Sequence, residues 1–375
     1  MNTSDVIVVG GGLVGSSVAY GLARAGARVQ VLDEGDDAFR ASRGNFGLVW
    51  VQGKGYKFAP YARWTRQSAS LWPTLAAELL DETGVDVHLQ QPGGYAFFFS
   101  EKEIEERRAR LQQIQDDLNG DYPFEMLDNA QIRERLPEIG PAVVGASYTP
   151  MDGHTNPLKV FRALHAACNK RGVAFRTRQT VASIKHANGV FRVQGNGTTF
   201  EAPRLVLAAG LGNRMLADMV GLHAPVQPNR GQVLVSERIR PFLNGPTMHV
   251  RQTDEGTIQI GDSLEDVGYN DGTTTDVLSN IAARAVKTFP MLGQLNLVRA
   301  WAALRVMSPD GFPIYQESPT RPGAFVVTCH SGVTLAANHV LRVAPWLAGG
   351  DKPQGIEEFA GDRFLNPDRV IQHAH

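Results

Sequence analysis

Cysteine is scarce in this sequence. The 375 residues include only two cysteines, Cys168 and Cys329, which stand far apart along the chain. Disulfide-rich domains and cysteine-ligated zinc or iron–sulfur sites need several cysteines, usually at short spacings. We therefore expect no disulfide framework, no metal site and a reducing compartment, which points to the cytoplasm.

Surplus charge and long apolar runs are absent as well. The 37 basic residues are balanced by 38 acidic ones, which gives a formal charge of −1. A protein that neutralises phosphates needs a basic surplus, so we expect no nucleic-acid partner. No stretch approaches the roughly 18 consecutive apolar residues of a membrane span, so we expect none. Residues 1–5 lack the cationic and apolar regions of a signal peptide, in keeping with a cytoplasmic protein.

The first 35 residues carry the strongest motif of the chain. The run 6–9 predicts a buried strand, and a G-x-G-x-x-G turn follows over 10–15. A helical pattern then leads to a second strand at 29–32, which ends at Asp33. A carboxylate at this place can accept hydrogen bonds from ribose hydroxyls. The order of strand, glycine turn, helix, strand and acid is typical of a dinucleotide-binding unit.

The glycines of this turn have separate physical tasks. Gly10 permits the tight turn, Gly12 lets the backbone approach a pyrophosphate, and Gly15 lets the helix pack on the strand. Leu13 and Val14 complete the turn at the helix N-terminus, where free N–H groups attract phosphates. The motif does not separate FAD from NAD, and an ordinary glycine turn is the alternative interpretation.

The loop after the second strand is small and polar. Its candidate cofactor contacts are Ser42, Arg43, Asn45, Gly47 and Leu48. Their hydroxyl, guanidinium, amide and backbone N–H groups could bind a second part of a cofactor. A solvated loop rich in turn-forming residues is the alternative, and the sequence does not decide between them.

Two more strand ends could touch a ligand. A strand predicted at 204–207 leads to the small residues Ala209 and Gly210, where open α/β sheets bind their ligands. A core strand with a tight exit turn is the alternative. A strand predicted at 325–328 precedes a helix that begins near residue 332, whose N-terminus could also meet a cofactor.

Residues 224–320 have a different pattern. A helix is predicted from Asp276 to Thr288. Four short antiparallel strands are predicted at 233–235, 247–251, 257–260 and 312–315. Because the whole chain is longer than one hydrophobic core usually serves, we expect a β-rich domain inserted into the dinucleotide fold.

Several motifs occur in an order that characterises one enzyme family. They are the glycine turn with Asp33 and the segments 41–47, 207–210, 301–313, 330–332 and 362–364. With these motifs the chain resembles, over nearly its whole length, the D-amino-acid oxidase family of FAD enzymes, which includes glycine oxidase and sarcosine oxidase. Segments 43–50 and 329–335 are similar to one branch, the flavoprotein β subunits of D-hydroxyproline dehydrogenase and opine oxidases.

The resemblance implies a fold and a division of the chain. The expected fold is α/β, with an FAD-binding Rossmann-like domain of the glutathione-reductase type interleaved with a β-rich α+β substrate domain. The discontinuous FAD-binding domain would comprise residues 1–90, 146–222 and 322–375. The substrate domain would comprise residues 91–145 and 223–321.

The resemblance also implies how FAD binds. The pyrophosphate would lie at the glycine turn, the ribose on Asp33, and the adenine against the backbone of Val181. Segment 42–48 would line the pyrophosphate and the flavin. The amides facing flavin N1 and the C2 oxygen would come from Gly332, Val333, Thr334 and Leu335. Sarcosine oxidases tether flavin through a cysteine near the Trp–Arg motif, and residues 301–313 contain none, so we expect non-covalent FAD.

The implied reaction moves a hydride from the carbon that carries the amine to flavin N5 and leaves an imine. We expect a dehydrogenase for a D-configured or secondary amino acid, in the first place cis-4-hydroxy-D-proline or D-proline. Its electrons would pass to partner subunits, an α subunit and a small γ subunit, in a hetero-oligomer. The alternatives are an opine oxidase β subunit, a glycine or sarcosine oxidase, a non-catalytic electron-relay flavoprotein and an NAD-dependent dehydrogenase.

Four residues are candidates for the substrate site. Arg305 stands where the family places its carboxylate-binding arginine, and a planar fork suits bidentate contact; pairing with Asp310 is the alternative. His249 and Arg251 alternate along a predicted strand and share one face, which lines either the pocket or the sheet surface. His330 precedes the flavin-facing helix and either lies near the pocket or bonds local backbone.

Overall fold

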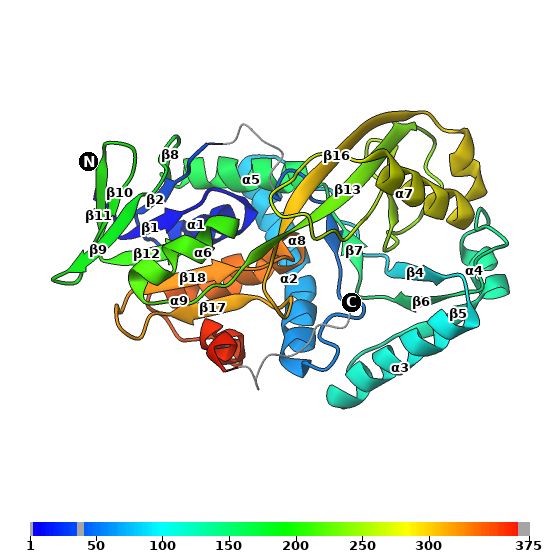
Figure 1. Cartoon of the computed structure of the whole chain (residues 1–375), viewed down its shortest axis with the longest axis horizontal. Coiled ribbons are helices and arrows are strands. Elements are labelled where there is room, and N and C mark those ends of the chain that lie inside the picture. Colours follow the sequence, from blue (N-terminus) through cyan, green and yellow to red (C-terminus); the bar gives the residue numbers. More distant parts are fainter. Residues whose placement is uncertain (1–2, 36–40, 367–375) are drawn as a thin grey trace.

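A six-stranded sheet contains the strand Val6–Val9 (β1) in its interior (Figure 1). The structure is a computed structural model that describes residues 3–35 and 41–366. β1 pairs in parallel with both of its neighbours, whereas the edge strand β17 runs antiparallel to β18. In spatial order the strands are β17 (Ile314–Glu317), β18 (Ala324–Thr328), β12 (Arg204–Leu207), β1, β2 (Val29–Leu32) and β8 (Ala174–Arg176).

Both faces of β1 are buried, as its unbroken β-branched run predicts. Val6 and Val8 pack in a cluster with the helical layer, and Ile7 and Val9 pack against a three-stranded meander. The helical layer consists of α1 (Leu13–Arg24), α2 (Ala59–Thr83), α5 (Pro157–Lys170), α8 (Gly332–Asn338), the π-helical turn η4 (His339–Val343) and α9 (Ala344–Leu347). The meander consists of β9 (Ser183–Ala187), β10 (Val190–Gln194) and β11 (Thr199–Ala202).

Two antiparallel sheets share a third hydrophobic cluster. An isolated bridge connects Tyr95 of one sheet to Thr247, which lies just before the other sheet begins at Val250. One sheet has the order β14 (Val250–Gln252), β15 (Thr257–Ile260), β13 (Gln227–Arg238), β16 (Leu297–Met307), and the other β4 (Gly94–Phe98), β6 (Gly145–Thr149), β5 (Glu125–Asp128). The accompanying helices are α3 (Glu101–Asp117), α4 (Asn129–Arg135) and α7 (Thr275–Thr288). In Figure 1 this part lies to the right of the parallel sheet, and its long strands β13 and β16 run from the middle of the molecule to the upper right.

Short elements complete the connections. β3 (Leu48–Val49) and β7 (Gly153–His154) form a small two-stranded sheet between the two parts. The remaining short helices are η1 (Gly210–Gly212), α6 (Asn213–Leu216), η2 (Asp218–Val220), η3 (Pro290–Gln294), η5 (Ile356–Phe359) and η6 (Gly361–Leu365).

The predicted α/β class is confirmed, but two predicted strands are wrong. The segment 312–315 does not join the antiparallel sheet, because Ile314 pairs with Thr328 and makes β17 an edge of the parallel sheet. The strand predicted at 247–251 begins only at Val250, because Thr247 Oγ1 accepts a hydrogen bond from Val250 N at 2.8 Å and closes a turn. The boundary expected between residues 145 and 146 falls inside β6, and the domain division stays a prediction.

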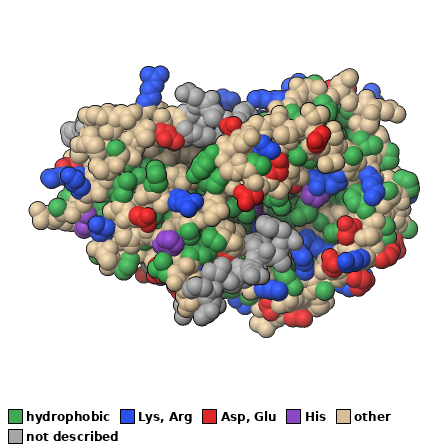
Figure 2. All heavy atoms as spheres, in the orientation of Figure 1, with side chains coloured by type: hydrophobic (Ala, Val, Ile, Leu, Met, Phe, Trp, Pro, Cys, Tyr) green, Lys and Arg blue, Asp and Glu red, His purple; other side chains and the backbone are tan. Residues whose placement is uncertain are grey.

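Charges of both signs are interspersed over the face drawn in Figure 2, with no broad field of one sign. This distribution agrees with the formal charge of −1. Among residues 3–35 and 41–366, no helix combines the length and the apolar character that crossing a bilayer requires. The same residues include no group of three or more His, Cys, Asp or Glu side chains placed to hold a metal ion.

A buried ion pair ties the C-terminal segment to the turn after β16. Asp310 is fully buried, and Arg363 binds it through Nε at 2.7 Å and Nη2 at 3.0 Å. Arg363 also donates to the backbone oxygens of Phe312 and Pro313. Asp310 is thus engaged by Arg363, and the alternative in which it pairs with Arg305 is wrong.

Arg363→Leu is expected to lower the free energy of unfolding by roughly 3–5 kcal/mol, because Asp310 would stay buried without its cation. Denaturant unfolding followed by circular dichroism measures the change. Arg28→Leu is the matched control, since Arg28 pairs with Asp5 at the surface and exposed pairs contribute little. Equal stability of the two variants would contradict a structural role for the buried pair.

Candidate cofactor and substrate site

Backbone groups approach each other closely at the turn between β1 and α1. Gly10 has φ +101°, and a Cβ at this position would collide with the backbone of Ala208. A Cβ on Gly15 would collide with Gly10 O. Only glycine fits these two positions, so the turn holds the start of α1 against the exit of β12.

Asp33 and Ser42 flank this turn. Asp33 Oδ2 accepts a hydrogen bond from Gly11 N at 2.7 Å, and Ser42 Oγ accepts one from Leu13 N at 2.8 Å. A Cβ on Gly12 would lie 2.9 Å from Ser42 Oγ, so a side chain at residue 12 would fill the space between turn and hydroxyl. The glycine turn, the carboxylate and the hydroxyl therefore form a cradle that fits the pyrophosphate and ribose of a dinucleotide.

Other predicted cofactor residues lie near this cradle. Gln179 N donates to Asp33 O at 2.8 Å, which places the segment that contains Val181 beside the end of β2. Ala209 and Gly210 follow β12, directly after the backbone that meets Gly10. The structure thus brings the adenine-side candidate and the small residues after β12 to the same edge of the parallel sheet.

The segment 45–48 is held by the surrounding backbone. Asn45 Oδ1 accepts from Gly47 N at 2.7 Å, and Gly47 O accepts from Thr155 N at 2.9 Å. Leu48 pairs with His154 in the β3–β7 ladder. Arg43 is exposed where the loop begins. Residues 45–48 are therefore an anchored segment and not a freely solvated loop.

The start of α8 is fixed by side chains from α2 and by the loop after β3. Ser68 Oγ donates to Thr334 O at 2.7 Å, and Trp72 Nε1 donates to Val333 O at 3.1 Å. Thr334 Oγ1 accepts from Trp50 N at 3.1 Å. Leu335 N already donates to Ser331 O. Of the four predicted amides, those of residues 332–334 therefore precede the intrahelical ladder and are the ones that can face a ligand.

Arg305 lies on β16 opposite Asn229 of β13. Its Nη2 lies 2.5 Å from Asp262 Oδ2, and its Nη1 donates to Ser263 O at 2.8 Å and to Asn229 Oδ1 at 3.2 Å. A Cβ on Gly231 would collide with both terminal nitrogens, so the guanidinium group rests against glycine backbone. The candidate clamp is thus rigidly oriented, with one carboxylate already beside it.

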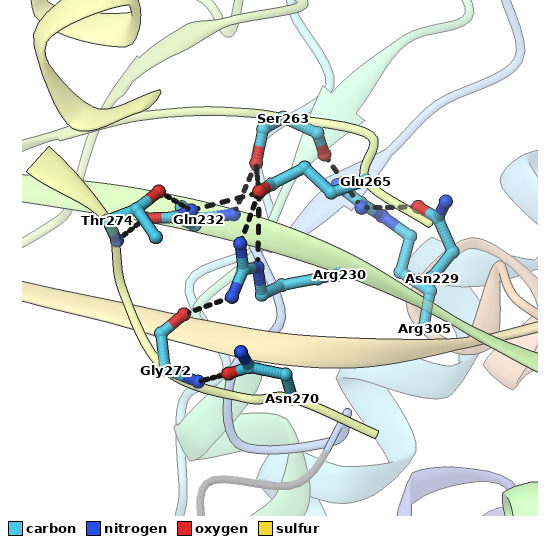
Figure 3. A network of polar contacts seen from close by, with 9 residues as sticks. All are labelled: Asn229, Arg230, Gln232, Ser263, Glu265, Asn270, Gly272, Thr274 and Arg305. Atoms are coloured by element: carbon cyan, nitrogen blue, oxygen red, sulfur yellow. Dashed lines mark hydrogen bonds and ion pairs between the residues drawn. The ribbon is translucent and has the colours of Figure 1, made fainter. Parts of the chain in front are cut away.

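A polar network next to Arg305 fixes the loop 261–274 (Figure 3). Arg230 is only 3% exposed and its Nη2 lies 2.5 Å from Glu265 Oε2. Glu265 also accepts hydrogen bonds from Gln232 Nε2 and Ser263 Oγ. Because Ser263 belongs to both sets of contacts, the network sets the position of the loop against Arg305.

Asp262 is the acidic centre of this region. Burial by itself would raise its pKa, but His249, Arg305 and Arg284 lower the pKa of Asp262 to about 2. His249 Nδ1 lies 3.4 Å from Asp262 Oδ1. Asp262 is therefore negatively charged at neutral pH, and it brings the predicted residues Arg305 and His249 together.

Arg251 and His330 lie in different surroundings. Arg251 is 2% exposed, donates from Nε to Gln259 Oε1 at 2.9 Å, and lies 6.0 Å from the centroid of the Phe46 ring. Burial lowers the pKa of Arg251 to about 10. Arg251 therefore packs where β14 meets the loop before β3.

His330 is exposed, with Nδ1 3.2 Å from Ser331 Oγ. The contacts of Arg251 and His330 with substrate stay predictions.

Comparison with known protein families identifies the family of this chain. Residues 5–339 match the family described as FAD dependent oxidoreductase. The chain belongs to this family. The expected D-amino-acid oxidase resemblance, the FAD cofactor and the assignment as an FAD-dependent oxidoreductase that acts on C–N bonds are thereby confirmed. The glycine turn, Asp33 and Ser42 are the residues that would hold the dinucleotide end of this cofactor.

Individual proteins similar to this chain lie within the same family. The chain is 47% identical over 361 residues to the B subunit of opine oxidase from Agrobacterium tumefaciens, covering 96% of this chain and 97% of that one. It is 46% identical to the corresponding protein of Rhizobium meliloti, over the same shares of both chains. Glycine oxidase of Geobacillus kaustophilus superposes with a TM-score of 0.89 at 24% identity, covering 100% of each chain, which shows a shared fold.

Sequence reasoning did not find Asp262 or Asn229. Asn229 meets Arg305 through the pairing of β13 with β16, strands separated by more than fifty positions in the sequence. Asp262 follows β15 in a segment of glycine, aspartate and serine, which looks like any turn. The two residues become visible only when the strand register is known.

Gly15→Ala is expected to abolish FAD binding, because the new Cβ would collide with the Gly10 carbonyl and push α1 away from the turn. The flavin absorbance of the purified protein measures the loss. Gly293→Ala is the control, since a Cβ there would make only ordinary contacts with Val286. A Gly15→Ala protein with full FAD content would contradict the role of this cradle.

Proposed function

We propose that this chain is the FAD-carrying subunit of an enzyme that oxidises the C–N bond of an opine, a secondary amine that carries a carboxylate on each carbon next to nitrogen. The observation that carries the proposal is the 47% identity, over 96% of the chain, to an opine oxidase component. The anchored Arg305 supports it, because a planar cation suits one of the two carboxylates. These relatives give no support to the hydroxyproline substrate that the sequence favoured.

The contacts of Arg305 suggest how the substrate would be oriented. Its guanidinium group is held on one side by Asn229 and Ser263, so it loses little freedom when it binds a carboxylate. When the substrate carboxylate binds the Arg305 guanidinium group, it would either share this group with Asp262 or displace Asp262 from it. The fixed arginine would direct the C–H bond toward the cofactor, and this orientation is the main task of the chain.

FAD, when bound, supplies the two-electron acceptor for this reaction. The residues that would hold it are the glycine turn, Asp33 and Ser42 at the dinucleotide end, and the amides of 332–334 at the ring. A strong base is not needed if the amine binds neutral. The substrate nitrogen can then release its electron pair into the C=N bond as the hydride leaves.

We further propose that the electrons leave through partner subunits. Both opine oxidase relatives are named as one lettered component of a larger enzyme, which supports a multi-subunit assembly. The α subunit and the small γ subunit that the family resemblance implies would be these partners. An isolated chain would then accept electrons from substrate but return them slowly to oxygen.

Arg305→Lys is expected to lower kcat/KM for the opine by roughly 100-fold, because an ammonium group keeps the charge but loses the bidentate fork. FAD content should not change. Arg238→Lys is the matched control, since Arg238 is 73% exposed on the neighbouring strand β13. Unchanged kcat/KM in Arg305→Lys would remove Arg305 from the substrate site.

Anaerobic titration of the purified flavoprotein distinguishes the candidate substrates. Octopine or a related opine should bleach the flavin band, whereas cis-4-hydroxy-D-proline, D-proline and sarcosine should not. Bleaching by the D-prolines alone would overturn the opine assignment and keep the C–N chemistry. No bleaching by any compound, in a protein that carries FAD, would favour a non-catalytic electron relay.

A further inference from the structure

Lys54 is a partly buried lysine whose ammonium group lies near the start of α8. Its Nζ donates to Ser331 Oγ at 2.6 Å and lies 3.4 Å from Thr334 Oγ1. Within the described part of the chain, Lys54 forms no ion pair with a carboxylate, whereas Arg305 is paired with Asp262. The polar partners of Lys54 are hydroxyl groups, so dipoles alone stabilise its charge at close range.

Burial lowers the pKa of Lys54 to about 8, a shift that Cys329 and Asp152 partly oppose. The ammonium form therefore still predominates at pH 7. Lys54 also keeps partial exposure, so it is not sealed inside the protein. A cation held in this way is costly unless an anion is present in the functioning protein.

The loop that carries Lys54 is held by a buried polar network. Asp152 Oδ1 accepts from Val51 N at 2.6 Å and from Gln52 N at 3.1 Å. Tyr122 OH accepts from Gly53 N at 2.9 Å and donates to Val51 O at 3.0 Å. Lys54 therefore extends from a fixed backbone, and its position does not depend on the flexible stem alone.

Ser331 fixes the ammonium end. Its Oγ accepts a hydrogen bond from Lys54 Nζ and another, at 3.0 Å, from Tyr61 OH. These two bonds use both lone pairs of the Ser331 oxygen. The hydroxyl proton of Ser331 is then left for His330 Nδ1, at 3.2 Å. Trp50, on the same loop as Lys54, has a buried Nε1–H for which the described residues offer no acceptor. The loop thus presents a cation and an unused donor beside the start of α8.

We propose that Lys54 lies beside the pyrimidine half of the flavin ring and stabilises the negative charge that the ring carries after reduction. The inference rests on the proposed function only in that FAD binds with its ring against residues 332–334. FAD, when bound, would accept the hydride of the substrate C–H bond while the nitrogen electron pair forms the C=N bond, and the reduced ring would carry a negative charge on its pyrimidine half. A fixed cation next to that charge favours the reduced state.

The test compares neutral and control variants of the FAD-loaded chain. Lys54→Met removes the charge and the donors, and Lys54→Gln removes the charge but keeps an amide donor for Ser331. Lys57→Met is the matched control, because Lys57 is exposed three residues further along the same loop. The two readouts are the midpoint potential of bound FAD and its affinity for sulfite, which adds to oxidised flavins and leaves the same negative charge on the ring.

Both neutral variants should weaken sulfite binding by about tenfold. They should also disfavour two-electron reduction by about tenfold, which corresponds to a midpoint potential lower by about 30 mV. Lys57→Met should match the unaltered protein in both measurements. If Lys54→Met does not fold, Lys54→Gln gives the same test.

Neutral variants that match Lys57→Met in both readouts would overturn the proposal. A rise in KM for the opine without either change would also overturn it and would assign Lys54 to the second carboxylate of the substrate. Loss of FAD by both variants would overturn it as well, because Lys54 would then serve binding and not the reduced charge. Neither readout needs a substrate, so a failed opine assignment would leave this test intact.

Discussion

The hydroxyl group of Thr334 makes the contact on which the arrangement of the site depends most. It accepts a hydrogen bond from Trp50 N and donates one to Leu48 O at 3.3 Å, and it therefore joins the loop after β3 to the first turn of α8. α2 secures the same turn from the other side through Ser68 and Trp72. Three segments that are distant in sequence meet at one residue, and their meeting shapes the surface that we propose for the flavin ring.

The two cations to which we assign roles, Arg305 and Lys54, differ in their partners. Arg305 has a carboxylate partner in Asp262, and the loop that supplies it is braced by the pair of Arg230 and Glu265. The hydrogen-bond partners of Lys54 are hydroxyl groups. A paired cation can exchange one anion for another at modest cost, whereas a cation held by dipoles gains most from a new charge. This difference is why we assign the substrate carboxylate to Arg305 and the charge of the reduced ring to Lys54.

Local sequence signals predicted the cofactor half of the fold well. The β1–α1 turn and Asp33 at the end of β2 depend on short-range rules that a sequence displays directly. The resemblance included the opine branch, but the preferred hydroxyproline substrate is not supported. Substrate choice depends on pocket shape, which short motifs do not encode.

The substrate half was less predictable for a physical reason. Asn229 and Asp262 reach Arg305 through the register of β13, β15 and β16, and no local pattern specifies that register. The strand predicted at 312–315 for the antiparallel sheet instead pairs with β18 at the edge of the parallel sheet. The apolar pattern of a short strand is the same in both places, so the sequence does not say which sheet it joins. Lys54 stands in a loop of glycines and aromatics that shows nothing of the network beneath it.

A crystal structure of the FAD-loaded chain with an opine analogue that cannot be oxidised would test the central claim most directly. We expect the flavin ring against residues 332–334 and one carboxylate of the analogue within hydrogen-bond distance of the Arg305 guanidinium group. An analogue bound elsewhere, with Arg305 still paired only to Asp262, would contradict the account.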